Sequence, residues 1–158
     1  MAIRSALNAK SHVDKVLVIV RPEDDALKKA LDEYHLPFVE NPAFEDGMSS
    51  SIRIAMNHIQ EDQNILLCLG DMPFISPDTY KQLIESFTTN GSNKIVRPVF
   101  LSEESESIPA HPVLFPALFQ EDLKKLKGDE GAKSILKTHK PVLLKTSDEG
   151  VIKDIDYV

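Results

Sequence analysis

The chain is poor in cysteine and in basic residues, and each shortage excludes a class of protein. Cys68 is the only cysteine of the 158 residues, which excludes an internal disulfide or a cysteine-rich metal site and is typical of the reducing cytoplasm. Eighteen Lys and Arg against 25 Asp and Glu give a net charge of −7, so we expect neither nucleic acid nor an anionic membrane as a partner. The longest apolar runs, such as residues 16–20, are too short to cross a bilayer, and we expect no signal peptide.

Glycine is also scarce. The sequence has six glycines, about 4% of its residues against a usual share of about 7%. The rest of the composition, with 42% apolar and 27% charged residues, is that of an ordinary globular protein. A chain of this length buries enough surface for one sizeable core, so we expect residues 1–158 to form a single domain.

Short apolar runs alternate with amphipathic segments along the chain. Repeated alternation of strand and helix indicates an α/β protein with a mostly parallel sheet and helices on both faces. Ligands of such sheets bind at the carboxyl ends of the strands. The periodicity predicts strands at 15–20, 37–40, 65–69, 94–100, 112–115, 141–146 and 151–155, and helices at 23–34, 49–60, from 76 onward, 117–126 and 130–139.

An aspartate follows the most apolar of the predicted strands, in the segment Gly70-Asp71-Met72-Pro73. We expect Gly70 to allow a sharp turn there. A carboxylate at the end of a buried strand is costly unless a cation meets it. Mg²⁺ suits such a place, because one or two carboxylates hold it while phosphates and water complete its coordination. The alternative is a turn aspartate that caps the helix beginning near Ser76, and both interpretations remain open.

A second acidic segment, Asp154-Ile155-Asp156, also follows a short apolar stretch. Two carboxylates from distant segments that meet at one sheet edge can share a divalent ion and align it on a triphosphate. The alternative is an acidic tail in solvent, which is the better interpretation when this segment is taken alone.

Three further segments carry groups suited to ligand binding. Gly47 and the serines after it open a predicted helix and offer donors to a base, ribose or phosphate, although a plain helix cap needs only one serine. His111 lies just before the strand predicted at 112–115. The histidine at this position either contacts substrate or forms a structural hydrogen bond. Residues 128–132 predict a helix junction or an anion site. We expect Cys68 in the core, and no histidine spacing indicates zinc.

Taken in order, these segments resemble the MobA-like nucleotidyltransferases, and among them the molybdenum cofactor cytidylyltransferases. The resemblance implies a Rossmann-like three-layer α/β/α sandwich of the nucleotide-diphospho-sugar transferase type. It also implies transfer of CMP from CTP, or GMP from GTP, to a molybdopterin-type acceptor with release of pyrophosphate. The segments that carry the resemblance are residues 41–51, 69–73, 111–115, 128–132 and 154–156.

The resemblance also assigns roles to single residues. Asp71 and Asp156 would be the catalytic pair that holds Mg²⁺. A cation is needed because the attacking phosphate and the α-phosphate repel each other, and Arg97 is a further candidate for that charge. The remaining assignments are Gly47, Met48, Ser49, Ser50, Ser51 and Gly70 for the nucleotide, and His111, Pro112 and Arg53 for the acceptor.

The sequence departs from the family pattern at its beginning. Members open with a buried strand and a Gly-rich basic loop around the triphosphate, whereas residues 1–7 resemble the helix that follows that loop. This departure implies an N-terminally truncated domain and poor transfer by the chain alone. It also predicts a gapped or rearranged sheet, pairing with another chain, or a longer natural protein. Ala110 stands where a glycine is common, and Tyr157-Val158 where members continue into a helix.

Three other functions stay open beside this one. The missing loop favours a non-catalytic cofactor-binding or maturation factor for a molybdenum hydroxylase. A transferase acting on another phosphorylated acceptor, such as a sugar phosphate, is a second alternative. A signalling receiver domain is disfavoured, because Asp71 directly precedes Met72 and because Arg21-Pro22 follows the first predicted strand in place of an acidic pair. The choice between CTP and GTP cannot be made from these residues.

Overall fold

The computed structural model describes residues 1–103 and 106–155. It divides the chain into two compact units, each built from segments that are distant in sequence. The first unit contains Met1–Asp14, Asn64–Pro116 and the described part of Pro141–Val158. The second unit contains Lys15–Gln63 and Ala117–Lys140.

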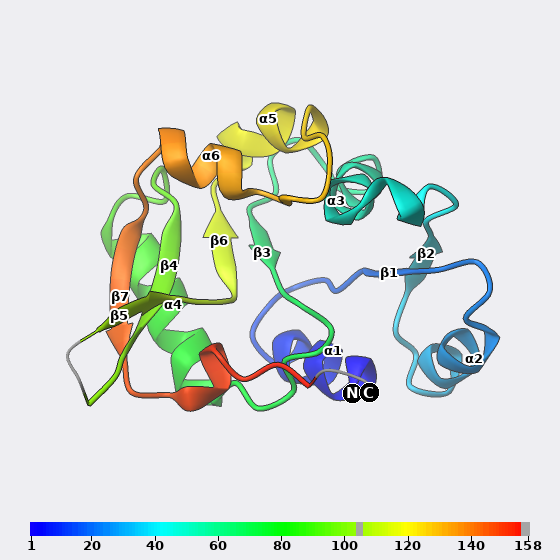
Figure 1. The fold of residues 1–158 in the computed structure, drawn as a ribbon, viewed down its shortest axis with the longest axis horizontal. Helices are drawn as coiled ribbons and strands as arrows, with labels where there is room; N and C mark the ends of the chain where they lie inside the picture. Colours follow the sequence, from blue (N-terminus) through cyan, green and yellow to red (C-terminus); the bar gives the residue numbers. More distant parts are fainter. Residues whose placement is uncertain (104–105, 156–158) are drawn as a thin grey trace. The chain divides into compact units, whose positions relative to one another are not determined.

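The first unit holds a five-stranded sheet (Figure 1). The strand order is β3-β6-β4-β5, and β7 pairs with β4. Among the strands that the structure describes in this sheet, only β4 and β7 form a parallel pair. The elements of this unit are α1 (Ala2–Lys10), β3 (Ile65–Leu67), α4 (Pro77–Thr89), β4 (Val96–Leu101), β5 (Ser107–Pro109), β6 (Val113–Phe115), β7 (Val142–Thr146) and the 3₁₀ turn η3 (Glu149–Val151).

Helix α4 packs on β4, β6 and β7 and buries the apolar face of the first unit. It begins as its sequence predicts, since Pro77 takes the first turn and the Ser76 hydroxyl accepts from the Asp78 N–H at 3.3 Å. Leu83 and Phe87 of this helix form an apolar cluster with strand residues. A second cluster lies beside the end of β3 and contains Ala9, Met72, Ile75, Tyr80, Ala110 and Val151.

The second unit holds two parallel strands, β1 and β2, in which Val18 pairs with Phe38. Helix α2 connects them and is capped by the Asp24 carboxylate, which accepts from the Leu27 N–H at 3.3 Å. Helix α3 packs against α5. The elements are β1 (Val18–Val20), α2 (Asp25–Glu33), β2 (Phe38–Glu40), η1 (Phe44–Asp46), α3 (Met48–Met56), η2 (Ala117–Phe119), α5 (Gln120–Lys124) and α6 (Lys133–Thr138).

The expected α/β class is confirmed, with more antiparallel pairing than the sequence predicts. The connections from β4 to β5 and to β6 contain no helix, and such short connections favour antiparallel pairing. The strand predicted at 151–155 is wrong: η3 ends at Val151, and the Ile155 N–H donates to the Asp71 carbonyl instead of to a strand. Strand β5 (Ser107–Pro109) lies between the strands predicted at 94–100 and 112–115, where the sequence predicted none.

The described strands form two separate sheets, because β1 pairs only with β2 and β3 only with β6. Among the helices that the structure describes, none has the length and apolar character needed to cross a membrane.

Candidate functional site

Asp71 lies in the turn that follows β3 in the first unit. Its Oδ1 atom is buried and has no hydrogen-bond partner within residues 1–103 and 106–155. Its carbonyl oxygen accepts from the Ile155 N–H at 3.0 Å, so the C-terminal acidic segment runs against this turn. Asp154 is exposed, and Asp156 lies outside the described residues. The structure therefore leaves a carboxylate oxygen of Asp71 available to a cation.

The segment that leads to Ile155 is held in place by Asp148 and Gly150. The Asp148 carboxylate accepts from the Ser76 N–H at 2.8 Å and from the Thr79 hydroxyl at 2.6 Å. Gly150 packs directly on the Phe74 carbonyl, where a Cβ atom would collide with the backbone. Sequence reasoning did not single out Asp148, because the neighbouring residues carry no sign of these long-range partners.

Helix α1 holds the Asp71 turn from the other side. The Ser5 hydroxyl donates to the Gly70 carbonyl and the Asn8 amide to the Pro73 carbonyl, both at 3.0 Å. Gly70 is not among the glycines with positive φ, and a Cβ there would meet only Ala2, at an ordinary 3.6 Å. The expected turn is present at Gly70 and Asp71, but neither its backbone angle nor its neighbours require glycine at position 70.

His111 lines a pocket of about 210 Å³ in the first unit, together with Asp154 and mainly apolar neighbours. Its Nδ1 atom is buried without a partner among the described residues. Burial, and secondarily the charge of Arg97, lower the pKa of His111 to about 4. Arg97 is itself fixed by donating from Nε to the Ala110 carbonyl at 3.0 Å. The imidazole is therefore neutral at physiological pH and offers an uncharged hydrogen bond; Pro112 beside it is buried.

In the second unit, the serines at the start of α3 bond to the protein itself. Ser49 donates to the Lys127 carbonyl at 3.2 Å, and Ser50 to the Gly47 carbonyl at 2.7 Å. The Asn41 amide donates to the hydroxyls of Ser50 and Ser51 at 2.8 and 3.0 Å. Ser49 and Ser50 are fully buried, so these two hydroxyls shape the turn. Sequence reasoning missed Asn41, whose partners lie nine and ten residues away.

Gly47 and Asp129 form the beginning of α3 together. Gly47 has φ +85°, and a Cβ there would lie 2.7 Å from the Asp129 Cα, so both the backbone and the close approach require glycine. Gly47 has no side chain to cap the helix, and the Asp129 Oδ1 accepts from the Met48 N–H at 3.2 Å in its place. Met48 itself is 43% exposed. The segment 128–132 therefore acts as a support for the α3 turn.

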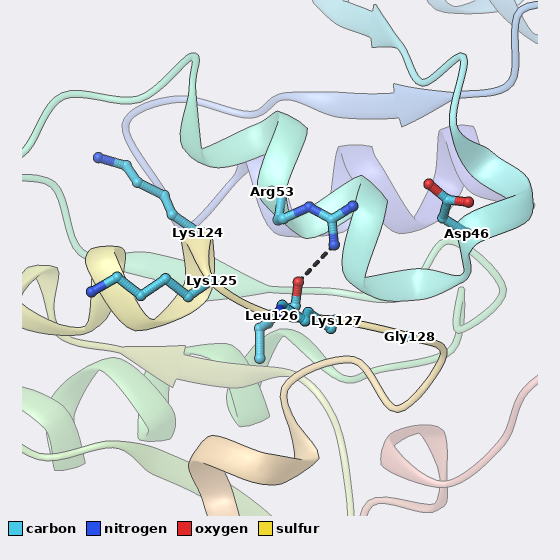
Figure 2. Close-up of a pocket in the computed structure, with 7 residues that line it drawn as sticks. All are labelled: Asp46, Arg53, Lys124, Lys125, Leu126, Lys127 and Gly128. Atoms are coloured by element: carbon cyan, nitrogen blue, oxygen red, sulfur yellow. Dashed lines mark hydrogen bonds between the residues drawn. The ribbon is translucent and has the colours of Figure 1, made fainter.

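Arg53 projects from α3 toward the chain that follows α5 (Figure 2). Its Nη1 atom donates to the Leu126 carbonyl at 2.6 Å. Arg53 also lines an open pocket of about 560 Å³ with Asp46 and residues 124–128, all in the second unit. The guanidinium is thus partly engaged in holding the loop, and its other edge borders the pocket.

Comparison with known proteins decides the family. The model of the MobA-like NTP transferase domain matches residues 1–142. The chain belongs to this family. Purine catabolism protein PucB of Bacillus subtilis is a relative, 27% identical over 172 residues that cover 99% of this chain and 77% of PucB.

Solved structures agree with membership in the MobA-like family at the level of fold. Rv0371c from Mycobacterium tuberculosis matches with a TM-score of 0.74 at 20% identity, over 92% of this chain and 73% of that one. Its complex with manganese matches with a TM-score of 0.69 at 18% identity, over 92% and 74%. The 4-diphosphocytidyl-2C-methyl-D-erythritol synthase from Anaerococcus prevotii matches with 0.71 at 15% identity, over 98% and 79%.

The chemistry of this MobA-like chain fits a hard divalent ion better than a structural metal centre. In the part of the chain that the structure describes, no three His, Cys, Asp or Glu residues converge. A nucleotide-bound Mg²⁺ needs only one or two protein carboxylates, and Asp71 has one carboxylate oxygen without a hydrogen-bond partner among the described residues. Burial raises the pKa of Cys68 to about 12, so this thiol is no nucleophile at neutral pH.

Proposed function

We propose that this chain is a metal-dependent nucleotidyltransferase that uses CTP or GTP and delivers the nucleotide to a molybdopterin-type acceptor, with release of pyrophosphate. The observation that carries the proposal is the buried Asp71 Oδ1 atom, which has no hydrogen-bond partner among the described residues. The C-terminal acidic segment lies against the same turn, because the Ile155 N–H donates to the Asp71 carbonyl. A carboxylate in that setting is stabilised by a cation. Membership of the MobA-like family supports the class of reaction.

Asp71 and Asp156 hold Mg²⁺ in this proposal. The ion, when bound, neutralises charge on the triphosphate. The turn from Gly47 to Ser51 binds the nucleotide through Ser51 and the exposed side chain of Met48, while Ser49 and Ser50 keep its shape.

The acceptor side of the proposal rests on His111 and Pro112. The neutral imidazole offers an unpaired Nδ1 to a heterocyclic or hydroxyl group of the acceptor. Arg53 and Arg97 supply nearby positive charge within their own units. The name of the relative PucB, a purine catabolism protein, supports a cofactor that serves purine-oxidising molybdenum hydroxylases, and such a hydroxylase would receive the product.

The choice of metal and nucleotide is supported by two neighbours in fold. One was solved with manganese, a divalent ion that takes the same oxygen ligands as Mg²⁺. Another is named for a diphosphocytidyl product, which favours CTP over GTP as the first nucleotide to test.

Binding of CTP with and without Mg²⁺ tests the proposal, measured by calorimetry on the wild type, Asp71→Asn and Asp78→Asn. Asp78 is a matched control, because its carboxylate is exposed on α4 and pairs only loosely with Lys81, at 3.8 Å. We expect Mg²⁺ to strengthen binding to the wild type and to Asp78→Asn. In Asp71→Asn the gain from Mg²⁺ falls at least about tenfold, because the neutral amide is a poor ligand for the ion.

Pyrophosphate release with a molybdopterin acceptor is the second readout. The measurement compares the two variants with the wild type and sets no absolute rate. Two results would contradict the proposed function. One is CTP binding to the wild type that does not change with Mg²⁺, and the other is an Asp71→Asn variant whose Mg²⁺-dependent CTP binding equals that of Asp78→Asn.

A further inference from the structure

A basic pocket lies in the second unit, where α3 faces the end of α5 (Figure 2). Its volume is about 560 Å³, within the range of roughly 300–1,000 Å³ that is usual for small-molecule sites. Arginine and lysine supply four of its seven lining residues, and the single acidic one is Asp46. The local charge therefore has the opposite sign to the net charge of −7. The lining consists of Asp46, Arg53, Lys124, Lys125, Leu126, Lys127 and Gly128.

Two of these cations, Lys125 and Lys127, form no ion pair within the residues that the structure describes, although the charge of Lys125 adds to that of Lys124 in lowering the pKa of Glu121. Lys124 is paired with Glu121, from Nζ to Oε1 at 2.7 Å, and only 31% of its side chain is exposed. The same carboxylate raises the pKa of Lys124, so its charge is permanent but largely compensated. Lys125 and Lys127 are exposed and form no ion pair within the described residues. These two lysines are therefore the ones available to an anion.

The loop that carries these lysines is fixed from one side. Its three successive carbonyls all accept from α3: Leu126 from Arg53 at 2.6 Å, and Lys127 and Gly128 from Ser49 at 3.2 and 3.3 Å. The N–H groups of Lys127 and Gly128 donate to no acceptor in the part of the chain that is described.

Gly128 opens the same loop to solvent. It has φ +71°, and a Cβ added there would meet nothing within 4 Å. Unpaired amides next to a left-handed residue form the kind of concavity that binds anions. The loop therefore presents two unpaired amides, while its carbonyls are bonded to α3. Figure 2 shows the Lys125 side chain extending away from Gly128, at the other end of the same segment.

We propose that this basic pocket binds a phosphate or diphosphate group of a small molecule. Charge-assisted hydrogen bonds from ammonium, guanidinium and main-chain N–H groups are the usual contacts of phosphate oxygens. A nucleic acid needs a longer basic surface than one five-residue loop and one arginine supply. The pocket shares Arg53 with the residues proposed above for the acceptor, but it is separate from the proposed metal site, since every lining residue belongs to the second unit and Asp71 to the first.

Titration with inorganic pyrophosphate in the absence of Mg²⁺ tests the inference, followed by ¹H–¹⁵N NMR spectra of the full chain. The variant is Lys125→Gln/Lys127→Gln. Its matched control is Lys137→Gln/Lys140→Gln, which removes the same charge from two exposed lysines of the same unit outside the pocket. We expect shifts at the Lys127 and Gly128 amides, a Kd at least about tenfold weaker in the pocket variant and a change below about twofold in the control.

Two further arms identify the source of the phosphate and separate this site from the metal site. The first arm compares the affinity for ribose 5-phosphate, a phosphate monoester, with the affinity for pyrophosphate. Binding of ribose 5-phosphate indicates a site for the phosphate of an acceptor, whereas a preference for pyrophosphate indicates a site for the pyrophosphate product. Either result supports the inference when the pocket variant abolishes it. Asp71→Asn is expected to bind pyrophosphate as the wild type does. Three outcomes would overturn the inference. They are equally weakened pyrophosphate binding in both double variants, loss of pyrophosphate binding in Asp71→Asn, and no shift of the Lys127 and Gly128 amide signals.

Discussion

The two units hold their functional segments in different ways. In the first unit the Asp71 turn is packed between apolar side chains such as Met72, Ile75 and Tyr80 and the close approach of Gly150. In the second unit the α3 turn is held by short polar side chains, with Asn41 at the centre of the hydrogen bonds. The first arrangement is sensitive to added volume, and the second to the loss of a hydrogen-bond partner.

This difference follows from the size of the two sheets. Five strands and α4 give the first unit a continuous apolar core, in which Leu83, Val96 and Phe115 are fully buried. Two three-residue strands give the second unit much less sheet surface to cover. Its loops are consequently cross-linked by amides and hydroxyls, as in the bonds of Gln120 to the carbonyls of Gln60 and Gln63 at 2.7 and 2.8 Å.

The largest effect is expected from added volume in the first unit. In Gly150→Ala the new methyl group collides with the Phe74 carbonyl, so either the C-terminal segment or the Asp71 turn must move. We expect the free energy of unfolding to fall by about 3 kcal/mol or more. Urea denaturation of the variant measures this loss.

The control for this substitution is Gly70→Ala, four residues before the contact. A Cβ at position 70 meets only Ala2, at 3.6 Å, and the backbone there needs no left-handed conformation. We expect a change within about 1 kcal/mol. If the two alanine variants lose the same stability, packing against Phe74 does not hold the segment.

A smaller effect is expected from the loss of hydrogen bonds in the second unit. Asn41 is 1% exposed and donates to Ser50 and Ser51 while its Oδ1 accepts from the Ala43 N–H at 3.0 Å. Asn41→Ala leaves these groups without a partner, and we expect a loss of about 2 kcal/mol in the free energy of unfolding. Asn57→Ala, at an exposed position of the same unit, should change it by less than about 0.5 kcal/mol. Equal losses would show that the polar network contributes nothing specific.

The apolar runs predicted the positions of several strands correctly, because apolar segments are buried when the chain folds. The runs at 15–20, 65–69 and 112–115 contain β1, β3 and β6, and Ser76-Pro77 marks the start of α4. The strand predicted at 151–155 was wrong because sequence periodicity does not register a distant partner. The Ile155 N–H donates to the Asp71 carbonyl.

The candidate site was predictable only where a residue's own neighbours reveal its role. Asp71 stands just after an apolar run, and the turn at Gly47 precedes a helix, so both could be chosen as candidates from the sequence. Asp129 and Asp148 act on segments 81 and 72 residues away, and no local pattern predicts such contacts. The three serines look alike in the sequence, yet two are fully buried and the third only partly.

The smallest effect is expected from a change of pH on the free energy of unfolding. This effect distinguishes the ionisable His111 of the first unit from the uncharged hydrogen-bond network around Asn41 in the second. Burial and Arg97 lower the pKa of His111 from 6.5 to about 4 in the folded chain. The unfolded chain binds the proton more readily, so stability is complete above about pH 6.5 and falls as the pH drops toward 4. From about pH 7.5 to about 5.5 we expect the wild type to lose about 1 kcal/mol from this group.

His111→Gln removes this titration, and urea denaturation at the two pH values measures the difference from the wild type. The exposed His58 provides the control, because His58→Gln should keep the pH dependence of the wild type. Asn41→Ala should lower stability equally at both pH values, because amides and hydroxyls do not titrate in this range. A His111→Gln variant that keeps the full pH dependence would mean that the imidazole is solvated in the folded chain, and the apolar setting assigned to the first unit would then not extend to this pocket.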